Sequence, residues 1–128
     1  MCRVLLVDDH AGFRKSFAGY LRSCLPSICI EEASDGQEAL DQIRTFGPLL
    51  VFIDIKLPGN NGLELTQTIK HAFPAIRIVM LTSHDLPEYR RAAALSGASD
   101  FWTKDTISLT KITDLLTSVC PAPAEPAL

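Results

Sequence analysis

Residues 49–54 read Leu-Leu-Val-Phe-Ile-Asp, an unbroken apolar run that ends on a carboxylate. A short, continuous run of this kind is typical of a strand buried on both faces of a parallel sheet. Turn-forming residues follow at 57–62, and Leu65 and Ile69 then have the spacing of one helix face. The stretch therefore predicts a strand, a loop and a helix, with Asp54 closing the strand.

The same unit repeats on both sides of this stretch. Apolar residues at helical spacing separate the apolar runs, and Gly47-Pro48, Phe73-Pro74 and Gly97 are typical signals for the end of a helix. Five alternating units predict an α/β fold with a doubly wound parallel sheet, because right-handed crossovers place helices on both faces. The predicted strands are residues 3–7, 28–33, 49–53, 76–81 and 98–102.

Composition indicates one ordinary globular domain. The chain has 128 residues, 47% of them hydrophobic and 21% charged, which is enough for a core without disulfide or metal. We expect a domain over residues 1–120 and a proline-rich tail, or the start of a linker, over 121–128. The four cysteines have no C-x-x-C spacing, so we expect reduced thiols that act as small buried hydrophobes.

Charge and hydropathy exclude several classes of function. The formal net charge is -3 and no basic run exceeds Arg90-Arg91, which disfavours direct nucleic-acid binding by this segment. The longest apolar run is too short to cross a membrane, and the apolar residues after Arg3 are too few for a signal peptide. We therefore expect a cytoplasmic protein with no membrane contact.

Polar side chains follow four of the five predicted strands. They are expected to meet, because ligand sites of open α/β sheets lie beyond the carboxyl ends of the strands. Three clustered carboxylates repel one another unless a cation lies among them, and carboxylate oxygens favour Mg²⁺. A carboxylate can also form an acyl phosphate, and Asp54 is the best nucleophile candidate. The residues are Asp8 and Asp9, Asp54, Thr82 and Lys104.

Each of these residues has an ordinary structural explanation when taken alone. Asp8, Asp9 and Thr82 could cap helices, Asp54 could belong to the turn, and Lys104 could be a surface cation. Four independent caps would not need three carboxylates, a hydroxyl and one lysine at the same sheet edge. Their joint placement favours phosphoryl transfer, in which a metal and Lys104 neutralise phosphoryl oxygens.

The ordered motifs of residues 3–119 resemble the receiver domain of a bacterial two-component response regulator. The matching motifs are V-L-L-V-D-D-H at 4–10, D-I-K-L-P-G-N-N-G at 54–62, M-L-T-S at 80–83 and G-A-S-D-F-W-T-K at 97–104. The resemblance implies a flavodoxin-like fold with strand order 2-1-3-4-5. It also implies a phosphoacceptor signalling domain and not a turnover enzyme, although self-dephosphorylation belongs to such domains.

The resemblance also implies a role for each site residue. Asp54 would take a phosphoryl group from a sensor histidine kinase or phosphotransfer protein, while Thr82 and Lys104 hold the phosphate. Asp9, Asp54 and the backbone carbonyl of Lys56 would bind Mg²⁺, with Asp8 acting through water. Phe101 would turn inward as Thr82 moves, and this change would alter an output surface and favour a homodimer.

Asp105 follows Lys104 where most receivers have proline. A cis peptide would cost about 3 kcal/mol without proline, so we expect a trans peptide there. The Lys104-Asp105 and Asp8-Asp9-His10 motifs resemble those of the NarL-type subgroup, whose members usually continue into a DNA-binding helix-turn-helix of a transcription regulator. Lys56 and His84 would flank the site mouth.

Several aromatic and histidine residues are expected to be structural. Strand alternation places Trp102 opposite Phe101, in the core beneath a helix. His10 and His71 are expected on the solvated surfaces of helices.

Two alternatives remain open. A phosphohydrolase also uses an aspartyl phosphate and Mg²⁺, but it would have its nucleophile after the first strand in a D-x-D motif, with a cap domain. A receiver-like interaction module that is never phosphorylated would not need the complete set of site residues. Formation of an acyl phosphate without turnover of generic phosphomonoesters separates the receiver from both.

Overall fold

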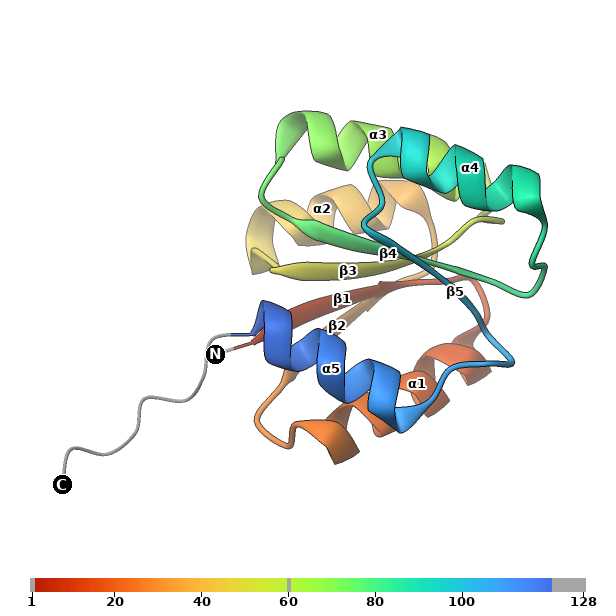
Figure 1. The fold of residues 1–128 in the computed structure, drawn as a ribbon. Helices are drawn as coiled ribbons and strands as arrows, with labels where there is room; N and C mark the ends of the chain where they lie inside the picture. Colours follow the sequence, from red (N-terminus) through yellow and green to blue (C-terminus); the bar gives the residue numbers. More distant parts are fainter. Residues whose placement is uncertain (1, 60, 121–128) are drawn as a thin grey trace, which may run out of the picture.

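The computed structural model describes residues 2–59 and 61–120, which form five consecutive strand–helix units (Figure 1). The strands are β1 (Arg3–Val7), β2 (Cys29–Ala33), β3 (Leu50–Asp54), β4 (Arg77–Thr82) and β5 (Asp100–Thr103). The helices are α1 (Ala11–Cys24), α2 (Gly36–Phe46), α3 (Gly62–Ala72), α4 (Pro87–Ser96) and α5 (Leu109–Val119).

The strands form one parallel sheet in the order β2-β1-β3-β4-β5. Helices α1 and α5 cover one face, and α2, α3 and α4 cover the other (Figure 1). Every residue of β3 is buried, as its continuous apolar run predicts. The predicted doubly wound α/β fold and its strand order are confirmed.

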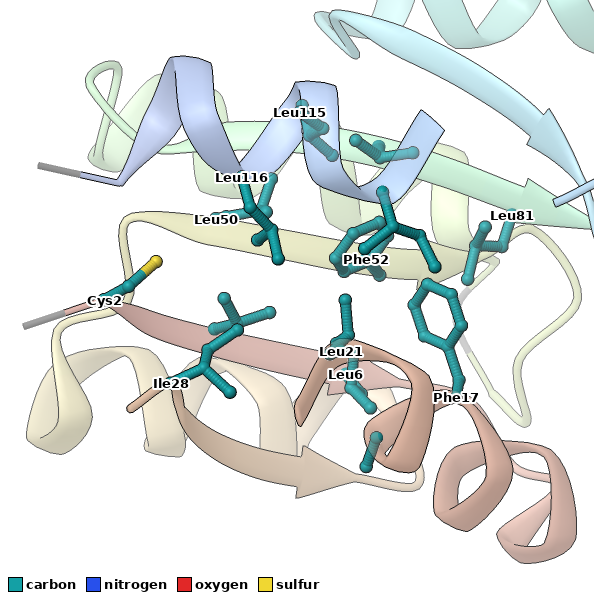
Figure 2. Packing of buried hydrophobic residues seen from close by; sticks show 14 of the residues in the cluster. Cys2, Leu6, Phe17, Leu21, Ile28, Leu50, Phe52, Leu81, Leu115 and Leu116 are labelled. Atoms are coloured by element: carbon teal, nitrogen blue, oxygen red, sulfur yellow. The ribbon is translucent and has the colours of Figure 1, made fainter. Parts of the chain in front are cut away.

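Each face of the sheet has its own hydrophobic core. Beneath α1 and α5, the Phe52 ring packs edge-on against Phe17 (Figure 2), with 4.9 Å between the ring centroids. The Phe52 ring centroid also lies 5.7 Å from that of Trp102. Phe101, the neighbour of Trp102, packs against the core of the opposite face. The predicted alternation of these two aromatic residues is confirmed.

Three of the predicted strands end one residue too early. Asp54 and Thr82 belong to β3 and β4, and Thr103 belongs to β5. Backbone pairing explains the difference, because Asp54 is in register with Leu81 and Thr82 with Thr103. Asp54 and Thr82 are thus held by the hydrogen-bonded sheet, whereas Asp8 and Lys104 directly follow β1 and β5.

The helix ends follow local signals in the sequence. Gly47 and Gly97 cap α2 and α4 with φ of 64° and 107°, a region that glycine adopts at little cost, and Phe73 caps α3. The predicted stop signals are confirmed.

The expectation of four unpaired, buried thiols is wrong. Cys2 and Cys120 form a disulfide, while Cys24 and Cys29 are half-buried free thiols. The two cysteines meet because β1 begins and α5 ends at the same end of the sheet (Figure 1). This proximity arises from the fold, so sequence spacing does not reveal the pair.

The tail predicted at 121–128 lies outside the described residues. No helix of the described part of the chain combines the length and apolar character needed to span a membrane.

Candidate functional site

The loop after β3 is shaped by a close approach of α3 to the end of the strand. A side chain at Gly62 would collide with the backbone carbonyl of Asp54, so glycine is required there. The Gly62 N–H donates to the Ile55 carbonyl at 2.7 Å, and the Ile55 N–H donates to the Leu81 carbonyl at 3.2 Å. These contacts hold Asp54 at the carboxyl edge of the sheet.

The Asp54 side chain is almost fully buried but has polar contacts on both oxygens. The Lys56 N–H donates to Oδ1 at 3.3 Å, and the Lys104 ammonium lies 3.4 Å from Oδ2. Burial and the nearby Asp8 carboxylate raise the pKa of Asp54, although Lys104 and the Lys56 N–H oppose the shift. The ionised carboxylate therefore costs folding free energy in this site and gains from a neighbouring cation.

Asp8 is the second buried carboxylate of the site. Its side chain is 3% exposed, and Oδ2 lies 2.6 Å from the Lys104 ammonium. This contact lacks hydrogen-bond geometry, and within the described residues no donor forms a hydrogen bond to Oδ2. A buried carboxylate oxygen without a hydrogen bond is costly unless a cation compensates it.

Lys104 contacts both acids because its backbone is held in place by the sheet. Its N–H donates to the Thr82 carbonyl at 2.8 Å, which extends the pairing of β4 with β5 by one residue. The ammonium also lies 4.3 Å from the centre of the Phe13 ring. The described residues contain no cis peptide bond, so the expected trans peptide before Asp105 is confirmed.

Asp9 and His10 form the exposed rim of the acidic cluster. The His10 Nδ1 atom lies 3.2 Å from Oδ1 of Asp8 and 3.2 Å from Oδ1 of Asp9, and the ring is 70% exposed. The expectation of a solvated His10 is therefore only half right, because its ring also contacts both carboxylates. The residue precedes α1 as its N-cap and does not lie within the helix.

The donor set fits a hard divalent cation. Asp8, Asp9, His10 and Asp54 each offer a ligand atom, and these atoms all lie within 4.8 Å of one another. Three of the four donors are carboxylates, and two of them, Asp8 and Asp54, are buried. This is an acidic cluster of the kind that binds Mg²⁺.

Thr82 is the last residue of β4, and Phe101 lies within the neighbouring strand β5. The Thr82 side chain is buried, and its Oγ1 accepts a hydrogen bond from the His84 N–H at 3.0 Å. Phe101 is half-buried, and the Arg90 guanidinium of α4 covers its ring at 4.7 Å from the centroid. Lys56 and His84, expected at the mouth of the site, are both exposed.

Sequence reasoning missed an ionic group that supports Asp8. Arg14 of α1 donates to the Asp8 carbonyl and, at 2.9 Å, to the Glu32 carboxylate of β2. Lys15 pairs with the other Glu32 oxygen at 2.9 Å. Arg14 lies one helical turn after His10, but only the pairing of β1 with β2 brings Glu32 close to it.

Comparison with known proteins identifies the family. Residues 4–117 match the response regulator receiver domain. The chain is 37% identical over 101 residues to the transcriptional activator protein ExaE of Pseudomonas putida, and 32% identical over 105 residues to the DNA-binding transcriptional activator DevR/DosR of Mycobacterium tuberculosis. These alignments cover 79% and 82% of this chain, but 47% and 48% of the relatives.

A solved structure agrees with this assignment. A two-component response regulator of the LuxR family from Aurantimonas sp. SI85-9A1 superimposes with a TM-score of 0.82 at 29% identity, over 93% of this chain and 84% of that one. The chain belongs to the response regulator receiver domain family. It spans about half the length of the curated relatives it matches.

Proposed function

We propose that Asp54 is the phosphoacceptor of this receiver domain. The observation that carries the proposal is the meeting of Asp8, Asp54 and Lys104 at one sheet edge, with the ammonium 2.6 Å and 3.4 Å from the two carboxylates. Asp54 lies at the end of the central strand β3, where its backbone is held in register with β4. A carboxylate fixed beside a cation can attack phosphorus while the cation attracts the phosphoryl oxygens.

The transfer is a displacement at phosphorus. An Asp54 carboxylate oxygen forms the new P–O bond, the bond from phosphorus to its donor breaks, and the electron pair leaves with the donor. With a phosphohistidine donor, the released imidazole nitrogen takes up a proton. Lys104 and the Thr82 hydroxyl hold the transferred phosphate, which requires the Thr82 side chain to reorient from its contact with the His84 N–H.

We assign the divalent cation of the reaction to the acidic cluster. Asp9, Asp54 and the backbone carbonyl of Lys56 would ligate Mg²⁺, and Asp8 would act through a water molecule. The ion would supply charge neutralisation at the phosphoryl oxygens. The closeness of the four donors supports this assignment.

The test is phosphorylation by a small acyl phosphate in the presence of Mg²⁺, followed by intact-mass spectrometry. A receiver gains a single phosphoryl group, which hydroxylamine releases because the bond is an acyl phosphate. A chain that gains no phosphate is a receiver-like interaction module and contradicts the proposal. Continuous turnover of a generic phosphomonoester would instead identify a phosphohydrolase, whereas slow loss of the adduct is self-dephosphorylation.

Mg²⁺ is expected to stabilise the unphosphorylated domain through Asp9. At ten times its Kd the ion adds about 1.4 kcal/mol to the free energy of unfolding by mass action. Asp9→Ala should lose most of this gain and Asp8→Ala less of it. Thermal unfolding with and without millimolar Mg²⁺ measures the effect.

Asp41→Ala is the matched control for Asp9→Ala. Asp41 is an exposed carboxylate of α2 that pairs with Arg44, and it lies outside the acidic cluster. Its Mg²⁺-dependent gain should equal that of the wild type. An undiminished gain in Asp9→Ala would contradict the metal assignment.

A groove beside Lys104 is the proposed contact for the phosphodonor. It has a volume of about 540 Å³ and lies between α1 on one side and the β5–α5 loop with the first turn of α5 on the other. Tyr20 and Leu109 line it and are each more than half exposed. We propose that a sensor histidine kinase or phosphotransfer protein packs an apolar surface here, next to the site.

The proposed output surface is formed by α4, β5 and α5. A Thr82 hydroxyl that moves to the phosphate leaves space into which Phe101 can turn, and this turn would take Phe101 out of its contact with Arg90. Leu95 of α4 is 80% exposed and would gain most from burial between two copies. Phosphorylation would thereby favour a homodimer.

Thr82→Ala is expected to uncouple this surface from the site. In the wild type, phosphorylation should change amide exchange between residues 86 and 119 and raise the mass measured by light scattering. At equal phosphorylation, verified by intact mass, Thr82→Ala should lose most of both changes, because the hydroxyl makes the coupling contact. Thr68→Ala, an exposed threonine of α3, should behave as the wild type.

We further propose that the domain controls a DNA-binding segment in a cytoplasmic transcription regulator. Support comes from the names of ExaE and DevR/DosR as transcriptional activators, and from their greater length. The formal charge of -3 disfavours direct DNA contacts by residues 1–128 themselves.

The proposed output surface can be contradicted by the wild type alone. If its phosphorylation altered neither amide exchange between residues 86 and 119 nor the mass measured by light scattering, the proposal would be wrong.

A further inference from the structure

A disulfide joins the two ends of the domain at the amino-terminal ends of the strands, opposite the end that carries Asp54. Cys2 precedes β1, Cys120 follows α5, and their Cα atoms lie 5.2 Å apart across a sequence separation of 118 residues. This Cα separation is ordinary for a disulfide. The start of β1 and the end of α5 lie side by side in Figure 1, and Figure 2 shows the Cys2 sulfur at the margin of the core.

The two cysteines differ in their access to solvent. Cys2 is 5% exposed and belongs to the core beneath α1 and α5, whereas Cys120 is half-buried and packs against the edge of that core. A small reagent in solution therefore reaches Cys120 first. Cys2 is then the second thiol, held in place to complete or reopen the bond.

The two free thiols are not equivalent alternatives to this pair. Cys29 lies between Ile28 and Ile30, which face the same core as Cys2, so strand alternation directs the Cys29 side chain to the opposite face. Cys24 packs against the same core as the pair, but it is a free thiol at the end of α1. Cys24 and Cys29 therefore provide matched controls.

We propose that Cys2 and Cys120 are a reversible thiol–disulfide site that tethers the end of α5 to β1. The oxidant is a small disulfide of the glutathione class. The Cys120 thiolate attacks it, forming a mixed disulfide and releasing one small thiol. Cys2 then attacks the Cys120 sulfur and releases the second small thiol. Two protein thiols and one small disulfide thus become one protein disulfide and two small thiols, and a dithiol reverses the reaction.

Closure of the bond has consequences for both stability and the end of α5. The closed loop includes nearly the whole domain, so the bond restricts the unfolded chain strongly. In the folded domain, the last turn of α5 is held by the Cys120 N–H bond to the Leu116 carbonyl at 2.8 Å and by the packing of Leu115 and Leu116. The tether fixes the point at which the chain leaves α5, while an open pair allows this turn to fray.

Thiol counting tests the chemistry. The folded protein is treated with glutathione disulfide or with dithiothreitol, quenched, unfolded and alkylated, and its intact mass is measured. The sequence has four cysteines. All should be alkylated after dithiothreitol, and two fewer after glutathione disulfide, with peptide mapping assigning the protected pair to Cys2 and Cys120.

Stability and amide exchange test the tether. Reduction should lower Tm by about 10 °C in the wild type and in the Cys24→Ser and Cys29→Ser variants. Amide exchange should accelerate at residues 116–120. Cys120→Ser, at the half-buried position, and Cys2→Ser should show no redox-dependent change.

Three outcomes would overturn the proposal. Cys2 and Cys120 could remain fully alkylated after the disulfide treatment, which would mean that the bond does not form. The bond could resist dithiothreitol in the folded protein, which would make it a permanent staple. Reduction could also shift the Tm of Cys120→Ser as much as that of the wild type. Because Cys120 is half-buried, Cys120→Ser keeps the test available if Cys2→Ser does not fold.

Discussion

Asp54→Asn is expected to abolish the phosphoryl adduct that the wild type forms with a small acyl phosphate. The amide has no charged oxygen with which to attack phosphorus, and no acyl phosphate can form on it. Intact-mass spectrometry should show the single adduct in the wild type and none in the variant. The effect should be complete, because the Asp8 carboxylate is held by the Lys104 ammonium and by the His10 N–H and does not offer a replacement nucleophile.

Asp100→Asn is the matched control for this substitution. Asp100 begins β5 at the amino-terminal ends of the strands, away from the site, and pairs there with Arg77 at 3.4 Å. This variant should be phosphorylated like the wild type. An adduct of equal yield in Asp54→Asn would show that another residue accepts the phosphate.

Loss of the adduct in Asp54→Asn should not reflect unfolding. Burial and repulsion from Asp8 raise the pKa of Asp54, so its ionised form destabilises the fold near neutral pH. The amide removes that repulsion, and Lys104 keeps its contact with Asp8. The unphosphorylated variant should therefore unfold at a temperature equal to or a few degrees above that of the wild type.

Lys104→Met is expected to destabilise the unphosphorylated domain by about 2 kcal/mol, or roughly 8 °C in Tm. Methionine keeps most of the apolar length of the side chain but removes the ammonium that lies between Asp8 and Asp54. Two buried carboxylates then repel each other without compensation. Mg²⁺ should stabilise this variant more than it stabilises the wild type, because the ion replaces the missing positive charge.

The loss in the free energy of unfolding caused by Lys104→Met should depend on pH. Lys104 lowers the pKa of Asp54, so its loss raises that pKa further above the value in the unfolded chain. A carboxyl with a raised folded pKa loses stability as pH rises through the folded pKa and regains it as pH falls. The deficit should thus be largest near neutral pH and shrink under acid conditions where Asp54 is protonated.

Lys15→Met provides the comparison for Lys104→Met. The Lys15 side chain is 73% exposed and pairs with Glu32, which keeps Arg14 as a partner. Its loss should cost less than about 1 kcal/mol. Equal stability of Lys104→Met and the wild type at neutral pH, or a deficit that does not shrink in acid, would show that Lys104 does not compensate the buried acids.

Much of this domain could be predicted from its sequence because the relevant signals are local. Continuous apolar runs mark strands covered on both faces, and their regular alternation with helices predicts a parallel sheet. The carboxyl ends of parallel strands all lie at the same end of the sheet. The sequence alone therefore places the residues that follow or end these strands in one site, namely Asp8, Asp54, Thr82 and Lys104. The strand order came from the resemblance of the motifs to receiver domains, since periodicity alone does not determine it.

The tertiary structure decided how these residues contact one another. Only the folded chain shows that Lys104 lies closer to Asp8 than to Asp54, because the backbone bond of Lys104 to Thr82 determines where the ammonium can reach. The inclusion of Asp54 and Thr82 in the strands likewise depends on pairing with neighbouring strands. Sequence periodicity does not specify such pairing.

The Cys2–Cys120 disulfide shows most clearly the difference between what the sequence predicts and what only the fold decides. Sequence by itself determined that these are small side chains at the two ends of the domain, and their separation of 118 residues gave no reason to pair them. A helix that follows the last strand runs back across the sheet, so α5 ends beside the start of β1 (Figure 1). Proximity of residues that are distant along the chain is a property of the crossover connections, and only the folded structure specifies it to within the few ångströms that a covalent bond requires.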